Sequence, residues 1–454
     1  MRLQAEFIAY FVFAVACAAY LSIRNSNRRR VLAFLIAFWI LGGSIIQQDF
    51  FSIPIEVLGG KLQIKRIIFL FLLLYLIFFS LVRTRNGTRR ISLTYEPLFY
   101  VFIFWSLVVF IYHLLDGGLK LKEFVRLTEG TLMVFVVYLC LRRWADESLI
   151  KVFTRALIVV GVISSIVAIL QFFVNPDILR TGSDRIAFGG KLRSNGVFDA
   201  EYMNSYILIG AGFLTLVSTA WSNRVKAVLL PLFTIGIVLS FHRMSWFVAF
   251  LLLIIYLVYE HKGKMWKFLL GASFVLFIFF VVTTELFPIL QQFEETSLYR
   301  SRINQNTMTN RLRYYEMVLN NYDKIAVWGA GSMKSSLYYY GMIDIEGRQW
   351  AKGEVGGIHN LYLETLFLYG TPLLCLLTAF LTTVLLSFKK YYRKFGPFFL
   401  FQFAFTFMFC TMNLSNSFPF NSEFPVFFGM VLGLGAAGAN IYMNSSTPSS
   451  LHLV

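Results

Sequence analysis

Residues 98–115 read LFYVFIFWSLVVFIYHLL. This run contains no Asp, Glu, Lys or Arg, and an apolar helix of this length nearly matches the thickness of a bilayer's hydrocarbon core. Similar runs of roughly 16–25 residues recur from the start of the chain to about residue 443. Runs of this length predict transmembrane helices rather than the core helices of a soluble protein.

The composition agrees with a membrane protein. Of 454 residues, 57% are hydrophobic and 14% are charged, and the mean hydropathy is +0.67. A soluble domain of this length needs a more polar surface. We predict an all-α polytopic transmembrane helix bundle of about 12–13 spans, forming one membrane domain over residues 1–454. The predicted spans are 6–23, 31–46, 67–82, 98–115, 126–141, 152–174, 202–221, 227–241, 244–259, 268–287, 361–388, 397–414 and 424–443.

Basic residues predict the orientation. Short loops rich in Lys and Arg follow every odd-numbered span as far as the eleventh, and such loops stay in the cytoplasm. They are Arg24–Arg30, Arg83–Arg90, Arg142–Arg143, Arg224–Lys226, Lys262–Lys267 and Lys389–Lys394. The C-terminal tail is then cytoplasmic and the N-terminus external. With one early span re-entrant, the count becomes twelve and the N-terminus moves inside.

Two loops are predicted on the outer face. The first covers residues 175–201, and the second covers 288–359. An ordered loop of about 70 residues is uncommon and usually functional. Asn310 could cap a helix over residues 311–321, so we expect the second loop to be partly helical.

These outer loops carry positive charge that the orientation rule does not explain. Arg243 adds another cation at the outer end of a span. The charges could bind a phosphate-bearing ligand, because guanidinium forks bind phosphate oxygens in pairs. They could equally be solvated loop charges paired with nearby carboxylates. The loop residues are Arg180, Arg185, Lys191, Arg193, Arg300, Arg302, Arg311, Arg313, Lys324, Lys334, Arg348 and Lys352.

His359 is the only histidine of the second loop, and it lies where the loop meets the next span. A histidine near neutral pKa can take a proton from a hydroxyl group, although a structural role fits the position as well. The sequence has no Walker loop, no paired outer-loop carboxylates of the DxD type, no GxSxG elbow and no Cys/His metal spacing. We therefore expect no metal, no cofactor and no nucleic-acid partner.

Five short motifs, taken in order, resemble the O-antigen ligase and polymerase superfamily of bacterial envelope glycosyltransferases. The resemblance covers roughly residues 150–385. Three features depart from the family pattern: Tyr315 replaces a Trp, Thr371-Pro372-Leu373 follows Gly370, and the first motif lacks a Pro-Asn pair. The motifs are Arg193-Ser-Asn-Gly196-Val-Phe leading to Asn204, Ser240-Phe-His-Arg243, Arg311-Leu-Arg-Tyr-Tyr315, Trp328-Gly329-Ala-Gly331, and His359-Asn360 followed by Gly370.

The resemblance implies a metal-independent glycosyltransferase of the bacterial inner membrane whose site faces the periplasm. Its donor would be an oligosaccharide on undecaprenyl diphosphate. His359 would accept the proton of the attacking hydroxyl, and Arg311 would join it in catalysis. The implied diphosphate-binding residues are Arg193, Arg243, Arg311, Arg185 and Arg313. The implied supporting residues are Asn360, Gly329, Gly331 and Gly370.

Three functions remain open. A polymerase would join O-antigen or exopolysaccharide repeat units on the lipid carrier, and this is the function we favour. A ligase would transfer the finished chain to lipid A–core. A transporter of lipid-linked glycan would show internal pseudo-symmetry and charged, interrupted spans, and neither is evident. Besides the bilayer and the lipid-linked donor, a flippase and a chain-length regulator are candidate partners.

Overall fold

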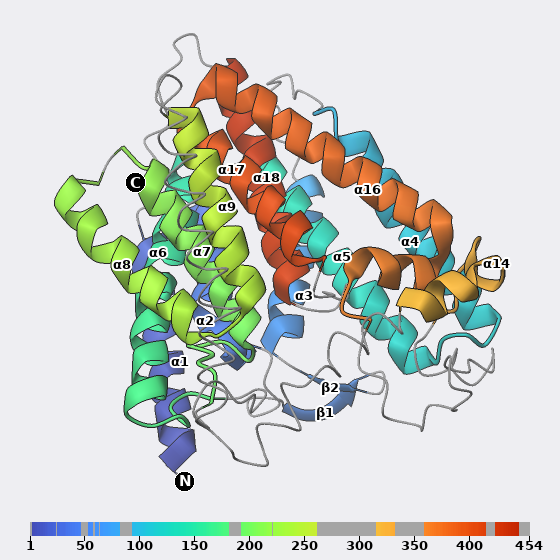
Figure 1. Cartoon of the computed structure of the whole chain (residues 1–454), viewed down its shortest axis with the longest axis horizontal. Coiled ribbons are helices and arrows are strands. Elements are labelled where there is room, and N and C mark those ends of the chain that lie inside the picture. Colours follow the sequence, from blue (N-terminus) through green and yellow to red (C-terminus); the bar gives the residue numbers. More distant parts are fainter. Residues whose placement is uncertain are drawn as a thin grey trace, which may run out of the picture. The chain divides into compact units, whose positions relative to one another are not determined.

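The computed structural model shows a chain built almost entirely of helices (Figure 1). It describes residues 2–23, 25–46, 53–57, 60–62, 64–81, 93–180, 192–219, 221–260, 315–331, 358–414 and 423–444. The helices are α1 (Arg2–Ser22), α2 (Asn27–Gly42), the short η1 (Gly43–Ile46), α3 (Ile64–Leu81), α4 (Glu96–Leu115), α5 (Leu121–Trp144), α6 (Glu147–Phe173), α7 (Glu201–Val217), α8 (Asn223–Leu239), α9 (Arg243–Glu260), α14 (Tyr322–Ile325), α16 (Leu361–Phe395), α17 (Pro397–Met412) and α18 (Glu423–Asn444).

The predicted all-α polytopic bundle is confirmed. Within the described residues, seven helices are long and apolar enough to cross a membrane. Each predicted span in this part of the chain coincides with a helix, whereas the predicted span 268–287 lies outside the described residues. The apolar runs predict helices well because a lipid-facing backbone must satisfy its hydrogen bonds internally. The full number of spans and the orientation stay predictions.

One local feature departs from the prediction. A short antiparallel hairpin of β1 (Ile53–Val57) and β2 (Gly60–Leu62) lies between η1 and α3. Its register pairs Ile53 with Leu62 and Val57 with Gly60. The sequence analysis missed it because the apolar residues here are too few for a span and were assigned to a connecting loop.

The chain divides into two compact units. The first consists of Met1–Val248, Cys375–Met412 and Phe418–Val454, and the second of Ala249–Leu374 and Asn413–Ser417. The expectation of a single membrane domain stays a prediction. Each unit is described below by itself.

In the first unit, α5 and α18 pack closely along their lengths. Gly429 and Gly433, one helical turn apart, make this approach possible. A Cβ at Gly429 would lie 3.0 Å from the Val134 carbonyl oxygen, and one at Gly433 would lie 2.8 Å from the Leu141 Cβ. Small residues at this spacing allow two membrane helices to bring their backbones together.

A buried ion pair joins α4 to α5 in the same unit. Glu96 is 1% exposed, and its carboxylate accepts hydrogen bonds from Arg142 and from the Tyr138 hydroxyl. Removing either partner would leave the other charge buried without compensation. Arg142, which the sequence analysis counted only toward orientation, therefore also holds these two helices together.

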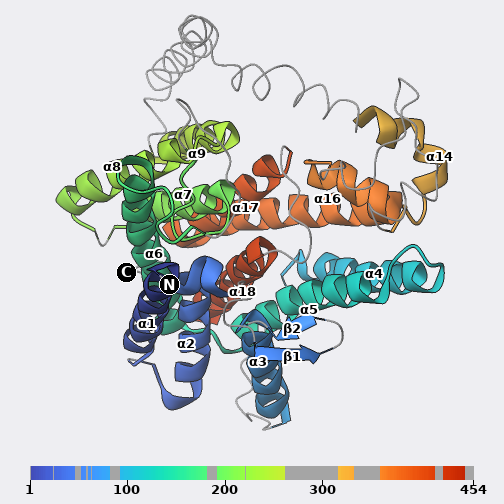
Figure 2. The same ribbon diagram turned by 90° about the horizontal axis from the view of Figure 1, so that it is seen from below.

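Helices α6, α7 and α8 form a second packed group within the first unit (Figure 1 and Figure 2). Side chains from α7 and α8 fill the space over small residues: Gly161 of α6 faces Ala211 of α7, and Gly236 of α8 faces Leu208 of α7. The connection from α6 to α7 contains residues 192–200. This connection carries the first sequence motif, and its placement defines the candidate site.

Candidate functional site

Residues 193–198 form a buried, non-helical segment between α6 and α7, which we name the Arg193 segment. Ser194, Asn195, Val197 and Phe198 are at most 1% exposed. A buried loop is stable only if its backbone polar groups find partners. Here the Gln171 side chain of α6 supplies several. Its Oε1 accepts from the Asn195 and Gly196 amides, each at 2.9 Å, and its Nε2 donates to the Gly196 carbonyl at 2.9 Å.

Gly196 allows this segment to approach α6 and α7. Its φ of +60° lies in the left-handed region that disfavours other residues. A Cβ there would lie 2.1 Å from the Ser164 Oγ and 2.6 Å from the Asn204 Oδ1. The Ser164 hydroxyl donates to Asn204 at 2.7 Å and accepts from the Val197 amide at 3.1 Å. Gly196 and Asn204 of the first motif therefore fix the backbone.

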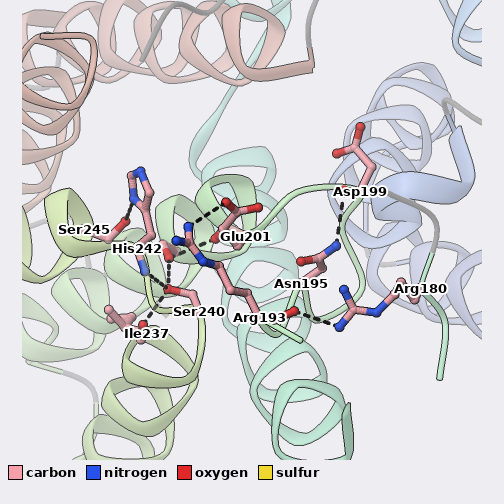
Figure 3. Close-up of polar contacts among 10 residues, drawn as sticks. Arg180, Arg193, Asn195, Asp199, Glu201, Ile237, Ser240, His242 and Ser245 are labelled. Atoms are coloured by element: carbon pink, nitrogen blue, oxygen red, sulfur yellow. Dashed lines mark hydrogen bonds and ion pairs between the residues drawn. The ribbon is translucent and has the colours of Figure 1, made fainter. Parts of the chain in front are cut away.

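Arg193 is held by its side chain, which pairs with Glu201, and by its backbone carbonyl, which accepts a bond from Arg180. Its Nη1 lies 3.2 Å from the Oε1 of Glu201, the first residue of α7 (Figure 3). The Glu201 side chain is fully buried, whereas 29% of the Arg193 side-chain surface is exposed. The Arg193 carbonyl accepts a 2.7 Å hydrogen bond from Arg180, which also donates to the Pro176 carbonyl at 2.6 Å. Arg180 is thus a loop-bracing residue, and Arg193 is the cation that reaches solvent.

The turn at residues 240–243, between α8 and α9, lies next to the Arg193 segment and α7, and we call these three parts together the cluster. The Ser194 amide donates to the Leu239 carbonyl at 3.1 Å. The Ser205 hydroxyl of α7 lies 2.8 Å from that of Ser240. Figure 3 shows Arg193, Glu201 and Ser240 gathered on one side of Asn195. Two motifs that are about forty residues apart in sequence are therefore built into one cluster.

Arg243 leaves this turn as the first residue of α9, and its side chain is exposed. The turn itself is strained, because Phe241 adopts a φ of +48°. Backbone and side-chain bonds hold it in place. The Trp246 Nε1 donates to the Ile237 carbonyl at 3.1 Å, and the His242 Nδ1 lies 2.6 Å from the Ser245 hydroxyl. Strain that is maintained by its surroundings is a common feature of functional sites.

A second carboxylate lies beside the Arg193 segment. Burial raises the pKa of Asp199 above its ordinary value, and the Glu201 carboxylate raises it further, whereas Lys65 at the start of α3 lowers it. The Asp199 carbonyl accepts a hydrogen bond from the Asn195 side chain at 3.3 Å. The cluster therefore contains cations and carboxylates together, so the charge of Arg193 is partly compensated within the protein.

In the second unit, His359 and Asn360 form the N-terminal end of α16. Asn360 caps the helix: its Oδ1 accepts from the amides of Tyr362 at 3.0 Å and Leu363 at 3.1 Å. Its Nδ2 donates to the Leu414 carbonyl at 3.1 Å. His359 is half-buried and adopts a φ of +55°, which is uncommon for a residue other than glycine.

The glycines of the last two motifs lock together a short segment and a break in α16. At Gly370 the helix is interrupted, with φ +81° and ψ 174°. Residues 326–331 replace the lost helical bonds. The Ala330 and Gly331 amides donate to the Phe367 and Leu368 carbonyls at 2.7 and 2.9 Å, and the Thr371 amide donates to the Ala326 carbonyl at 2.8 Å. We call these three bonds the glycine interlock.

The glycine interlock depends on the absence of side chains. A Cβ at Gly329 would lie 2.2 Å from the Tyr369 amide nitrogen, and one at Gly370 would lie 2.2 Å from the Val327 carbonyl oxygen. Pro372 adds a reason for the arrangement, because it has no amide hydrogen for the Leu368 carbonyl. The structure therefore gives Gly329 and Gly370 a backbone-packing role.

Several predicted residues fall outside the described part of the chain: Arg185, Arg311 and Arg313, together with most of the loop 288–359. Tyr315 begins a described helical stretch at 315–320. Sequence reasoning missed two residues that organise the cluster, Gln171 and Glu201. The available signals were a polar residue near the end of an apolar run and an acidic residue closing a basic loop.

Comparison with known families adds one finding. Residues 227–378 match the family model described as O-antigen ligase. The match includes Arg243, the glycine interlock and His359, and the Arg193 segment precedes it. No curated protein shows significant similarity to the chain. A domain of this family in a multi-pass membrane chain supports a membrane glycan-processing function. Residues 227–378 are therefore similar to an O-antigen ligase domain, which supports the predicted resemblance to the O-antigen ligase and polymerase superfamily.

Proposed function

We propose that this chain is a glycosyltransferase that polymerises repeat units carried on undecaprenyl diphosphate, at the periplasmic face of the bacterial inner membrane. The O-antigen ligase domain supports the class of reaction. The observation that carries the proposal is the cluster in the first unit. There the Arg193 segment is bonded to the end of α8 through Ser194 and Leu239, and α7 is bonded to the turn that carries Arg243 through Ser205 and Ser240.

The arginines of this cluster suit a diphosphate. Arg193 projects from a buried, rigid segment and keeps 29% of its side-chain surface exposed. Arg243 is exposed at the end of a fixed turn. A guanidinium held on a rigid backbone binds phosphate oxygens with little further loss of freedom. We assign Arg193, Arg243 and Arg311 to the donor diphosphate, with Arg185 and Arg313 as further candidates in the same loops.

His359 is the proposed general base. Its left-handed backbone conformation is maintained by the Asn360 cap, and an imposed strain of this kind favours a functional role over a packing role. In the reaction, the acceptor hydroxyl oxygen attacks the anomeric carbon of the donor sugar. The bond from that carbon to the diphosphate oxygen breaks, His359 takes the hydroxyl proton, and the arginines stabilise the departing undecaprenyl diphosphate.

The second candidate function is ligation, which the description of the matched family favours. The donor chemistry is the same, and the acceptor is lipid A–core in place of another lipid-linked chain. A flippase that supplies the donor and a chain-length regulator are proposed partners of the polymerase. Each function predicts a different glycan product, so one experiment separates them.

The test is the surface glycan profile of a deletion strain complemented with wild type, His359→Ala or Arg243→Gln. Each variant is first checked for insertion into the membrane. Lipid A–core that carries a single repeat, in the deletion strain and with inserted His359→Ala, supports the polymerase. Loss of all glycan from core, with long chains on the lipid carrier, assigns the ligase instead.

Arg224→Gln is the matched control. Arg224 is an exposed arginine near the start of α8, and the turn that carries Arg243 follows the other end of that helix. We expect Arg224→Gln to keep the wild-type profile, because the proposed donor site does not include it. If inserted His359→Ala and Arg243→Gln also give wild-type profiles, glycan transfer by these residues is wrong and transport becomes the better explanation.

A further inference from the structure

Glu201 stands out as a buried carboxylate that neither the sequence motifs nor the proposed reaction uses. It is the first residue of α7, and its side chain is 0% exposed. Its Oε1 accepts a hydrogen bond from the Arg193 Nη1 at 3.2 Å. The positive end of the α7 dipole also favours an acidic residue at this position.

Stability alone is a weak reason for this ion pair. Burying a carboxylate is unfavourable, and well-packed apolar residues often replace a buried pair without loss of stability. The position of Glu201 is, by contrast, tightly defined. The Ser205 hydroxyl lies 3.0 Å from the Glu201 carbonyl and 2.8 Å from Ser240, and Asn204 is bonded to Ser164 of α6. These bonds fix the start of α7 against α6 and against the turn after α8, and they fix the backbone of Glu201 with it.

We infer that Glu201 is a positioning residue, which holds the Arg193 guanidinium in the orientation that binds the donor diphosphate. This inference rests on the proposed function. A guanidinium has five N–H donors, so a bond from Nη1 to Glu201 leaves the group able to bind a phosphate as well. Fixing the side chain beforehand removes the entropy loss that a mobile arginine would suffer on binding.

A nearby carboxylate also lowers the net charge of the cluster. In a mainly electrostatic arrangement, removing Glu201 would strengthen binding of a diphosphate. In a positioning arrangement, removing it weakens binding, because Arg193 loses its orientation although the local charge becomes more positive. The two mechanisms thus predict opposite signs for the same substitution.

The test is a double-mutant cycle on the full-length protein in lipid nanodiscs, with undecaprenyl diphosphate as the probe. Its Kd and the melting temperature are measured for wild type, Glu201→Leu, Glu201→Gln, Arg193→Gln, Arg193→Leu and the double variant Arg193→Leu/Glu201→Leu. We expect Glu201→Leu to weaken binding roughly tenfold, about as much as Arg193→Gln. Glu201→Gln keeps an acceptor oxygen, so it should weaken binding only about threefold or less.

The double variant separates positioning from stability. Two apolar residues should recover the melting temperature that Glu201→Leu loses, while the Kd stays no better than in the single variants. The inference is overturned if binding recovers together with the melting temperature, or if Glu201→Leu binds as well as wild type or more tightly.

Arg243→Gln distinguishes a failure of this inference from a failure of the proposed function. If Arg243→Gln loses affinity for undecaprenyl diphosphate and Glu201→Leu does not, the positioning role is wrong and the donor site stands. If the wild-type protein does not bind the probe at all, the proposed function is wrong and the role of Glu201 falls with it.

Discussion

Replacing Gly370 with alanine should open the glycine interlock. Alanine at a φ of +81° is strained by about 1–2 kcal/mol. Its Cβ would also lie 2.2 Å from the Val327 carbonyl oxygen, which is backbone and has no flexible end to move away. Relieving this overlap separates residues 326–331 from α16 and breaks three hydrogen bonds, each worth about 0.5–1.5 kcal/mol. The expected local destabilisation is therefore about 2.5–6.5 kcal/mol.

Gly396→Ala is the control for the backbone strain. Gly396 has a φ of +95°, and a Cβ there meets no heavy atom within 4 Å among the described residues. This variant should lose only about 1–2 kcal/mol. The difference between the two variants is then the contribution of the three bonds, about 1.5–4.5 kcal/mol.

Hydrogen–deuterium exchange measures this difference directly. The amides of Ala330, Gly331 and Thr371 are the donors of the glycine interlock. In Gly370→Ala their exchange should be faster by roughly ten- to a thousandfold beyond any change in Gly396→Ala, since each 1.4 kcal/mol is about tenfold. Equal exchange of these amides in the two variants would show that the packing argument is wrong.

Two further predictions concern single residues. His359→Gly should insert and fold at least as well as wild type, because glycine tolerates a φ of +55°, while glycan transfer is lost; a retained glycan profile would contradict the proposed base. Asp199→Asn should raise the melting temperature at pH 8 and less at a pH below the ordinary Asp pKa of 3.8. The wild-type carboxyl has a raised pKa and loses stability as the pH rises through that value, so an equal gain at both pH values would contradict this.

The spans could be predicted from sequence because a membrane imposes one local rule. Every lipid-facing backbone group needs a partner within its own segment, so a long apolar run has few options besides a helix. Residues 98–115 illustrate this, since they lie within α4. The β1–β2 hairpin follows no such rule. Its two short strands contain too few residues to show a periodic pattern, so sequence alone predicts a connecting loop there.

The candidate site could be predicted only in part. A cation such as Arg243 is visible in sequence, because it lies at the predicted outer end of a span, where the positive-inside rule does not call for basic residues. The Arg193–Glu201 pair is not visible, since it depends on how a buried, irregular segment folds between two helices. The Gln171 contacts are hidden for the same reason. A polar residue inside an apolar run gives no indication of which backbone it will satisfy.

The glycines of the motifs hold neighbouring backbone segments close together. Gly196, Gly329 and Gly370 each prevent an overlap with a neighbouring segment, so their presence reports close packing of the backbone. The departure at Thr371-Pro372 fits this interpretation. Pro372 withdraws a donor from the Leu368 carbonyl, and the Gly331 amide replaces it. Within the described residues, the chemistry of the proposed reaction then rests on the partly exposed Arg193, the exposed Arg243 and the strained His359. Substitutions at the glycines test the backbone packing around these residues.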